Sequence, residues 1–543
     1  MKNIIKTILS IISLNKRNFN SWRYQIKEYN HLKKLLKKVE RKQKINKCIV
    51  FNPVRYDREF LDREIFLGKL LALNGAKVYI LLDDGVLLHW ETYQVNHLTD
   101  INQINRTNLN PYNNPKLINN QFVITHFYKK TIIKKALKTY RDKNLKIIYY
   151  SSVLRKVNLN NWQELKKHAK SSTIRFFKTS ELDYNNKFVK YYYNLSLKNA
   201  ILSKNVAEFI YNNIRPDIFI TSHAIYSTWG PPFEYLNKKG VKCLHYSFVH
   251  GHSINPKEIF ISSGSSVFFL SSSKNWKIFK QKSVTEDMKN KINQYFTSRL
   301  SFNTSDTKIL YKGKRTSFKV DKNDGYKYHI SLFPNVIWDG NICDKHKVFE
   351  DYRDWILSTI NFIKNKSDIK LYIRSHPSEI TVLKNSPRIV DIITKNIDMN
   401  NIDNVTLIPP EEIIDTYEFL KSGIDLGLIY DGFLAVEMPF LRIPTIMCVK
   451  GGMFAVENGN IIVTSKKEYF DYLDNIEKTL KDFHKNYQER YKNIVRYIYW
   501  YIFENAIKLP TLSKTRYIET NLLQLKQDDL IIDEKLLEIF RDQ

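Results

Sequence analysis

Short apolar runs alternate with longer amphipathic stretches along most of this chain, and this pattern is typical of strands that alternate with helices. The first three segments are a strand over 48–51, a helix over 62–74 and a strand over 77–82. This order predicts a βαβ unit. Further apolar runs predict strands over 121–125, 146–150, 217–221, 242–246 and 266–270. Because the spacers are long enough for crossover helices, we expect parallel strands with helices on both faces.

A second alternating series begins with a strand over 329–333, after a stretch over 274–324 that has few sustained apolar runs and is the expected connection between two domains. The series continues with strands over 369–374, 404–408, 425–430 and 445–449 and helices over 351–364, 413–422 and 432–440. The sequence therefore predicts an α/β fold with two doubly wound, Rossmann-like domains that face a cleft. A last long helix, over 469–503, is expected to cross back to the first domain.

The predicted domain organisation has four segments. They are a basic amphipathic helical extension over 1–46, a first Rossmann-like domain over 47–324, a second over 325–510 that includes the crossover helix, and a helical tail over 511–543. Ligands of such sheets bind beyond the carboxyl ends of the strands, so the residues that follow each strand are the candidates for chemistry.

The predicted strand over 369–374 delivers Arg374 and His376 to the cleft, where Pro377 ends the strand and Glu379 lies in the next turn. The arginine is suited to hold a phosphate by charge-assisted bonds, and the imidazole to donate to an oxygen of a leaving group. Glu379 is suited to accept hydrogen bonds from a ribose or sugar hydroxyl. A capped turn around a satisfied histidine is the alternative interpretation of the same residues.

A second group follows the predicted strand over 425–430. Asp431 and Gly432 come directly after it, and Gly432 is expected at a helix start, where backbone amides favour a phosphate. Glu437 lies about a turn and a half into that helix. The alternative is a turn glycine with a solvated glutamate.

The order of these motifs resembles a known family. An apolar strand, Arg-x-His-Pro-x-Glu, a further strand, Asp-Gly-x-x-x-x-Glu and a proline before the next strand are similar to the C-terminal domain of bacterial capsule polysaccharide biosynthesis glycosyltransferases of GT-B fold. The segment 333–339 and Trp355 also resemble that group, and the His-Pro pair resembles the nucleotide-binding motif of bacterial sialyl- and Kdo-transferases. The resemblance covers about 328–450. It departs at Tyr430-Asp431-Gly432, where relatives commonly have a small Ser/Thr/Gly stretch before the helix.

The resemblance implies that the protein transfers a sugar from a nucleotide donor, a UDP- or CMP-sugar, to a growing glycan or lipid-linked acceptor. It also implies that no cofactor or metal is bound. Carried over by position, Arg374 and His376 would contact donor phosphate and Glu437 the nucleotide ribose, while Asn335 and Asp339 would line the cleft. The first domain would bind the acceptor and the second the donor.

An inverting transfer needs a group that takes the proton of the acceptor hydroxyl. In the loop after the first strand, Asp57 is the first candidate and Glu59 the second. His223 and His250, in loops after later strands, are alternatives. An ion pair of Asp57 with a neighbouring arginine is the competing interpretation. The histidines over 245–252 lack a paired carboxylate, so we expect an acceptor-site loop there and no metal.

The charge of the chain is strongly positive, +31 with 86 Lys and Arg against 55 Asp and Glu, and 14 of these basic residues with only two acidic ones lie in 1–47. The apolar positions over 4–12 with this basic stretch fit an interfacial helix on an anionic membrane. The alternative is a helix packed on the protein itself through a buried stripe formed by Leu32, Leu35, Leu36 and Val39. The apolar run over 4–14 is too short to cross a bilayer. We expect a cytoplasmic protein, peripheral at most on the inner face of the plasma membrane.

Other functions find less support in the sequence. The four cysteines are widely spaced and form no Cys-x-x-Cys pair, so neither a disulfide framework nor a zinc site is predicted. A nucleotide-sugar epimerase of the same architecture is one alternative function. A non-catalytic basic protein that binds membranes or nucleic acid is another, but zinc-finger spacing and RNP-like aromatic patterns are missing, so no nucleic acid partner is expected.

Overall fold

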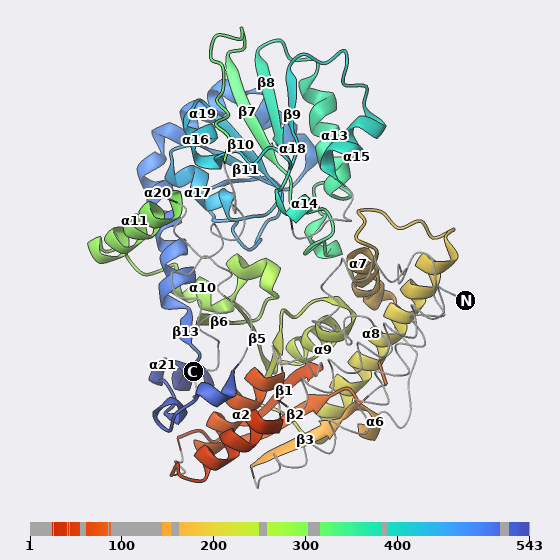
Figure 1. Cartoon of the computed structure of the whole chain (residues 1–543), viewed down its shortest axis with the longest axis vertical. Coiled ribbons are helices and arrows are strands. Elements are labelled where there is room, and N and C mark those ends of the chain that lie inside the picture. The colour runs from red at the N-terminus through yellow and green to blue at the C-terminus, as the bar shows by residue number, and fades with distance from the viewer. Residues whose placement is uncertain are drawn as a thin grey trace.

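The structure is a computed structural model, and it describes most of the chain. The described residues are 24, 26–40, 42, 44–54, 61–84, 86–87, 144–153, 162–248, 258–301, 315–381, 388–510 and 521–541. The predicted strand over 121–125 lies outside these residues. Two sheets organise the molecule, one above the other in Figure 1.

The first sheet has seven strands in the order β13-β6-β5-β4-β1-β2-β3. They are β1 (Cys48–Val54), β2 (Lys77–Leu82), β3 (Leu145–Tyr149), β4 (Ile218–Ser222), β5 (Lys242–Phe248), β6 (Glu258–Ser263) and β13 (Ala506–Lys508). The strands from β3 to β5 are parallel, which confirms the prediction for them. β6 runs antiparallel to β5, and β13 antiparallel to β6, so the sheet is mixed at this edge.

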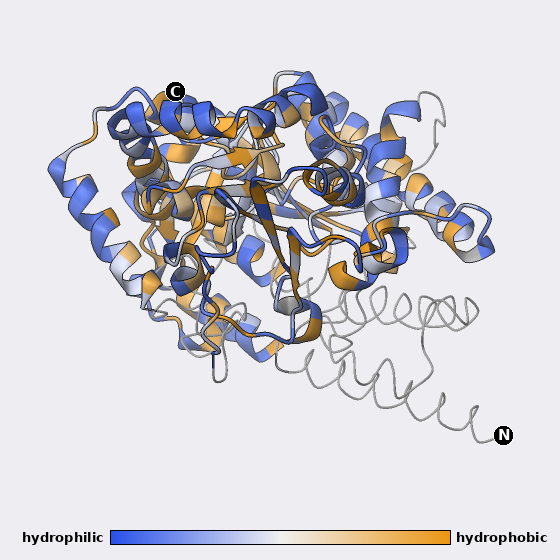
Figure 2. Ribbon diagram, turned by 90° about the horizontal axis from the view of Figure 1, so that it is seen from above, coloured by the Kyte–Doolittle hydropathy of each residue, from blue (hydrophilic) through white to orange (hydrophobic). Residues whose placement is uncertain are grey.

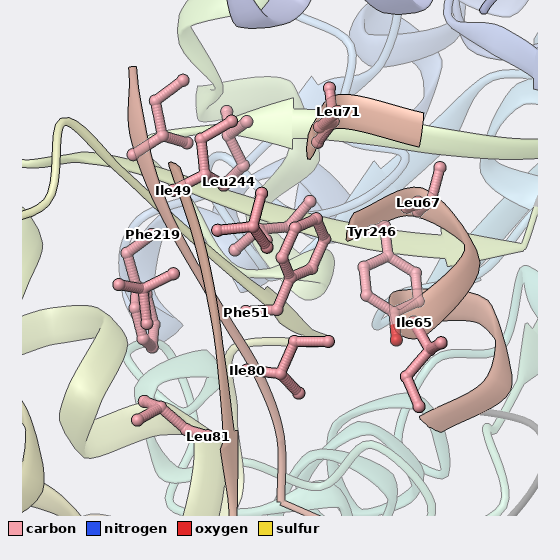
Figure 3. Packing of buried hydrophobic residues seen from close by; sticks show 14 of the residues in the cluster. Ile49, Phe51, Ile65, Leu67, Leu71, Ile80, Leu81, Phe219, Leu244 and Tyr246 are labelled. Carbon is pink, nitrogen blue, oxygen red and sulfur yellow. The ribbon is translucent and has the colours of Figure 1, made fainter. Parts of the chain in front are cut away.

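Helices connect these strands along the chain, and α10 and α11 follow β6 and precede the second sheet. They are α2 (Arg63–Leu73), α6 (Tyr150–Val153), η5 (Gln163–Leu165), α7 (Lys166–Phe177), α8 (Lys187–Asn213), α9 (Tyr226–Lys238), η6 (Val267–Ser272), α10 (Lys274–Phe279) and α11 (Glu286–Leu300). The core is built from β-branched and aromatic residues of the strands. Figure 3 shows Ile49 and Phe51 of β1 among Ile80, Phe219 and Leu244 of the neighbouring strands, with side chains of α2 packed beside them.

The second sheet has six parallel strands in the order β12-β11-β10-β7-β8-β9. They are β7 (Tyr328–Phe333), β8 (Ile369–Arg374), β9 (Val405–Ile408), β10 (Leu426–Ile429), β11 (Thr445–Met447) and β12 (Ile461–Ile462). The helices around it are η7 (Cys343–Lys345), α13 (Tyr352–Ile363), α14 (Ser378–Thr381), α15 (Ile389–Asn396), α16 (Thr416–Lys421) and α17 (Leu434–Phe440). Both sheets therefore have a doubly wound order, and the predicted pair of Rossmann-like domains is confirmed.

Three elements differ from the sequence prediction. The run over 266–270 is not a strand but the helical turn η6, and the true edge strand is β6. The single helix expected over 469–503 is divided into α18 (Lys466–Asp474), α19 (Ile476–Lys485), α20 (Tyr487–Tyr499) and the π-helical turn η8 (Trp500–Glu504). The stretch expected to connect the domains contains α10 and α11, and α11 packs on α20 and contacts α17.

The chain does return to the first domain at its C-terminal end. After α20, β13 joins the first sheet, and η9 (Leu522–Gln524), η10 (Asp528–Leu530) and α21 (Glu534–Phe540) follow. Figure 1 shows α20 running from the upper domain toward β13 and α21. The last strand and the core residues of α21 therefore belong to the first domain.

The helix over 26–36 packs on the first domain. Leu32 is fully buried in the core cluster, and Leu35, Leu36 and Val39 pack against it. This confirms the packed alternative for these residues, whereas 4–12 lie outside the described part. Among the described residues, every helix is too short or too polar to cross a bilayer. Figure 2 shows polar colours on the outer helices and hydrophobic colours in the central strands.

Candidate functional site

The strand order of the second sheet reverses between β7 and β10, which is where a doubly wound sheet binds its ligand. Asn335 follows β7, and Asp431 and Gly432 follow β10. A Cβ atom added to Gly432 would lie 3.8 Å from the Asn335 amide nitrogen. The structure therefore brings together three residues that the sequence analysis had placed in two separate motifs.

The end of β8 lies beside this point, because β8 pairs with β7. Arg374 and Ser375 are buried there, and the Ser375 backbone N–H donates to the Ile408 carbonyl at 3.0 Å. His376 is partly buried, and Pro377 leads into α14. Burial, and the positive charge of Arg374, lower the pKa of His376 to about 4, while Asp339 acts in the opposite direction. The imidazole is therefore neutral near pH 7 and has a proton to donate.

Asp431 forms a buried ion pair that the sequence did not predict. The Lys345 ammonium lies 2.7 Å from the Asp431 carboxylate, and the two side chains are 2% and 5% exposed. The same ammonium lies 3.9 Å from the ring centroid of Phe268, which belongs to the first domain. Lys345 thus places a positive charge at the reversal point of the second sheet and at the domain interface together.

Buried oxygen atoms without hydrogen-bond partners gather at this edge. Asn335 Oδ1, Ser375 Oγ and Asp431 Oδ1 find no partner among the described residues. They follow the neighbouring strands β7, β8 and β10. Buried polar atoms are rarely left unpaired, so such a group indicates a place for a polar ligand or ordered water.

Glu437 and Glu379 are both engaged by protein groups. The Glu437 carboxylate, on α17, contacts the Arg299 guanidinium of α11 and accepts a hydrogen bond from the Tyr417 hydroxyl of α16 at 2.5 Å. Glu379 accepts from the backbone N–H of Ile389 at 3.2 Å. The structure thus places Glu437 in the packing of three helices, and Glu379 on α14 with its carboxylate at the start of α15.

In the first sheet the order reverses between β1 and β4. At or just after these two strand ends, four non-glycine residues have a positive φ. They are Val54 (61°), His223 (56°), Ala224 (57°) and Tyr226 (63°). Such conformations cost of order 1–3 kcal/mol each and cluster at functional sites. The candidate base His223 therefore stands in a strained loop, where the Ser222 hydroxyl contacts its Nδ1 atom. Asp57, Glu59 and His250 lie outside the described residues.

One arginine connects the two strand edges. Arg175 of α7 donates to the Tyr226 hydroxyl at 2.9 Å, and its guanidinium lies 3.9 Å from the Asp339 carboxylate. Tyr226 begins α9, directly after the strained loop that follows β4, and Asp339 belongs to the segment after β7. The candidate residues of both domains therefore share one interface.

The structure describes one histidine of the predicted cluster, His245, while His250 and His252 lie outside the described residues. His245 is fully buried within β5, between the rings of Phe233 and Phe260, because the strand extends to Phe248. Burial lowers the pKa of its imidazole to about 4. His245 is thus a core residue and not part of an acceptor loop. Among the residues that the structure describes, no three His, Cys, Asp or Glu side chains group as metal ligands.

Lys345 and Arg175 are the residues that the sequence analysis missed. Lys345 lies in the polar run Asp344-Lys345-His346, which falls outside every recognised motif. His346 also belongs to this run, and its Nδ1 atom lies 2.9 Å from the Tyr430 hydroxyl. The polar run in the segment after a buried strand was the one sequence feature that pointed to Lys345 and His346.

Comparisons with known proteins give structural similarities only. No family model and no curated protein matches the chain. Three solved structures have a similar arrangement. They are KpsC of Thermosulfurimonas dismutans, a beta Kdo 2,4 transferase (11% identity, 46% of this chain, 74% of that chain, TM-score 0.31), a UDP-N-acetylglucosamine 2-epimerase (10%, 84%, 94%, 0.24) and the spinosyn rhamnosyltransferase SpnG (10%, 83%, 96%, 0.24). The assignment of the site rests on the residues described above.

Glu379→Gln is expected to change the pH dependence of stability. Burial raises the pKa of Glu379 to about 7. The neutral carboxyl is therefore favoured in the fold, so its contribution is fully present below the unfolded value of 4.5 and is lost as the pH rises through 7. Between pH 5 and 8 the wild type should lose roughly 2–3 kcal/mol relative to the glutamine variant. Urea unfolding at several pH values measures this difference. Parallel curves for the two proteins would show that the carboxyl is not perturbed.

Proposed function

We propose that the protein is a metal-independent glycosyltransferase that moves a sugar from a nucleotide-sugar donor to a growing surface glycan, such as capsule or lipopolysaccharide. The observation that carries the proposal is the edge formed by β7, β8 and β10. There, buried unpartnered oxygens lie beside an arginine, a neutral histidine and a buried lysine. This combination suits a ligand that presents both phosphate charge and hydroxyl groups.

In this proposal, the second domain holds the donor. Arg374 binds the phosphate groups by charge-assisted hydrogen bonds, and Lys345 offsets the negative charge of Asp431, which would otherwise repel them. Asn335 and Ser375 hydrogen-bond the nucleoside or the sugar. Glu437 contacts the ribose only if its bonds to Arg299 and Tyr417 rearrange.

The proposed chemical step uses charge that develops on the leaving nucleotide. As the bond from the anomeric carbon to phosphate breaks, negative charge grows on the phosphate oxygen. His376 donates a hydrogen bond to that oxygen, and Arg374 stabilises the charge. A base of the first domain takes the proton of the acceptor hydroxyl as the new glycosidic bond forms. The donor and the base lie in different domains, so both edges must face the reacting sugar.

Binding and turnover of labelled nucleotide sugars test this function. The full-length protein is titrated with UDP- and CMP-sugars, and then incubated with donor and a panel of oligosaccharides. Saturable donor binding with a label that moves to an oligosaccharide supports a transferase. Conversion of the donor into its epimer without an acceptor identifies an epimerase. Absence of binding to every nucleotide sugar contradicts both.

Asp57→Asn is expected to lower kcat strongly while leaving donor affinity unchanged. The substitution keeps the size of the side chain and removes the carboxylate that would take the proton, so only the transition state loses a partner. The loss should be on the order of 10²–10⁴-fold, the range of general base catalysis. Steady-state kinetics beside donor titration separates the two parameters. Unchanged turnover would mean that the base is Glu59, His223 or His250 instead. Glu59→Gln, His223→Gln and His250→Gln would then identify it.

A further inference from the structure

A cavity of about 290 Å³ lies between the two domains. The strained loop after β4 lines it through Ala224–Tyr226, and the loop after β7 lines it through Ile342–Asp344. The next residue after this loop segment is Lys345, the partner of Asp431. The cavity therefore extends from the candidate acceptor edge toward the candidate donor edge.

Charged groups are fixed in the wall of this cavity. The Glu234 carboxylate lies 2.8 Å from the Lys167 ammonium and 3.3 Å from His168 Nε2. These two groups outweigh its burial and hold the pKa of Glu234 down at about 2. A Cβ atom at Gly230 would come within 2.4 Å of the His168 ring, so this glycine is what allows the imidazole to lie there. Glu234 is thus ionised near pH 7 and accepts hydrogen bonds from a fixed position.

Further polar and apolar groups complete the wall. Ser265 is 8% exposed, lines the cavity, and its hydroxyl has no hydrogen-bond partner among the described residues. Asn237 adds an amide, while Phe233 and Phe269 add aromatic surface. A few fixed polar groups on a partly aromatic wall are typical of a site that binds a small polar molecule with apolar faces.

Two tyrosines, the exposed Tyr184 and the half-buried Tyr193, contact each other near the border of the two domains. Tyr184 and Tyr193 pack edge to face with ring centroids 5.3 Å apart, and Tyr184 is 44% exposed. Tyr193 belongs to α8, which packs on α7, and α7 carries the cavity residues Lys167, His168 and Ser171. An ion pair between Arg353 of α13 and Glu181 ties the loop that carries Tyr184 to the second domain. Tyr184 and Tyr193 therefore form an aromatic surface at the domain border.

We propose that this interdomain cavity binds the terminal sugar of the acceptor glycan and that the Tyr184–Tyr193 pair carries the next sugar of the chain. A sugar ring has hydroxyl groups around its edge and apolar C–H faces, so it suits both the Glu234, Lys167 and Ser265 groups and the aromatic rings. With about 290 Å³ the cavity is near the lower end of the range of ligand pockets, about 300–1,000 Å³, and this size suits a ligand as small as one sugar ring. The inference rests on the proposed glycosyltransferase function.

The residues of the cavity favour the acceptor over the donor as the occupant. Apart from Ile342–Asp344, its lining comes from the first domain. The candidate phosphate ligands Arg374 and His376 do not line it, and neither do Asn335 or Asp431. The strained loop with His223, a candidate base, adjoins it. A hydroxyl bound in this cavity would thus lie between the base of one domain and the donor of the other.

Glycan binding by surface variants tests the inference. The full-length protein is applied to an array of neutral and acidic oligosaccharides, from single sugars to hexasaccharides, and its strongest ligands are titrated in solution. Tyr184→Ala and Tyr193→Ala should lower the affinity for disaccharides and longer glycans about tenfold and leave single sugars unchanged. Glu234→Gln should lower the affinity for all glycans by at least tenfold. UDP- and CMP-sugar affinity should stay unchanged in all three variants.

Tyr191→Ala is the matched control. Tyr191 is 45% exposed and lies two residues before Tyr193 on α8, so it points to a different side of the helix. Thermal unfolding checks that each variant is folded. If Glu234→Gln does not fold, the surface variant Tyr184→Ala still tests the inference. The inference is overturned if no glycan on the array binds while nucleotide sugars do, or if all variants bind like the control. It is also overturned if Glu234→Gln weakens donor binding instead. Failure of the proposed function shows separately, as absence of nucleotide-sugar binding.

Discussion

Replacing Arg374 by methionine is expected to weaken binding of the nucleotide-sugar donor about 10- to 100-fold, because a hydrogen bond to a charged group contributes about 1.5–3 kcal/mol. Arg374 is the last residue of β8, and its side chain is buried there. The same change removes a positive charge that lowers the pKa of His376, so that pKa should rise above its present value of about 4. Calorimetry with UDP- and CMP-sugars measures the first effect, and NMR titration of the histidine measures the second.

Arg496→Met is the control for this substitution. Arg496 lies on α20 and donates to the Lys282 carbonyl at 2.8 Å, away from the edge of β8. It should leave both the donor affinity and the histidine titration unchanged. If Arg374→Met shifts the His376 titration but not donor affinity, then the arginine is a neighbour of the histidine without being a phosphate ligand. If neither changes, the donor site lies elsewhere.

The loop after β7 links the two halves of the proposed reaction. Its residues Cys343 and Asp344 contact the first domain, where the Cys343 N–H donates to the Ser171 hydroxyl at 3.1 Å and the Lys167 ammonium lies 2.9 Å from Asp344. Its next residue, Lys345, is bound to Asp431 of the donor edge. A donor phosphate that attracts Lys345 would therefore act on the wall of the acceptor cavity through adjacent residues. Donor and acceptor binding should be coupled for this reason.

Much of the fold follows from local sequence patterns. The strands over 77–82 and 369–374 have the predicted bounds, because continuous apolar runs with polar flanks mark strands buried on both faces. The run over 266–270 is equally apolar but forms the helical turn η6, since a short run does not distinguish a strand from a buried turn. The division of the last helix coincides with Asn475 and Asn486, which end α18 and α19.

The site is only partly a consequence of local patterns. Periodicity places Arg374 and Gly432 at strand ends, and the parallel order of β8, β7 and β10 then brings them to one edge. The ion pair of Lys345 with Asp431 depends on the path of a loop, which no periodic pattern specifies. The contact between Glu437 and Arg299 likewise depends on how α11 packs. Long-range pairs of this kind depend on tertiary packing, and the pattern of a single segment does not specify them.

Lys345→Met is expected to destabilise the fold by about 3–5 kcal/mol, because it leaves the Asp431 carboxylate buried without its partner. Urea unfolding measures the loss. The double variant with Asp431→Asn should recover most of it, since both charges are then absent, yet it should still bind donor more weakly than the wild type. Lys238→Met is the control, because its pair with Glu164 is 66% and 76% exposed and contributes at most about 1 kcal/mol. Equal losses in the Lys345 and Lys238 variants would mean that water reaches Asp431, and the buried pair could then not position the donor edge.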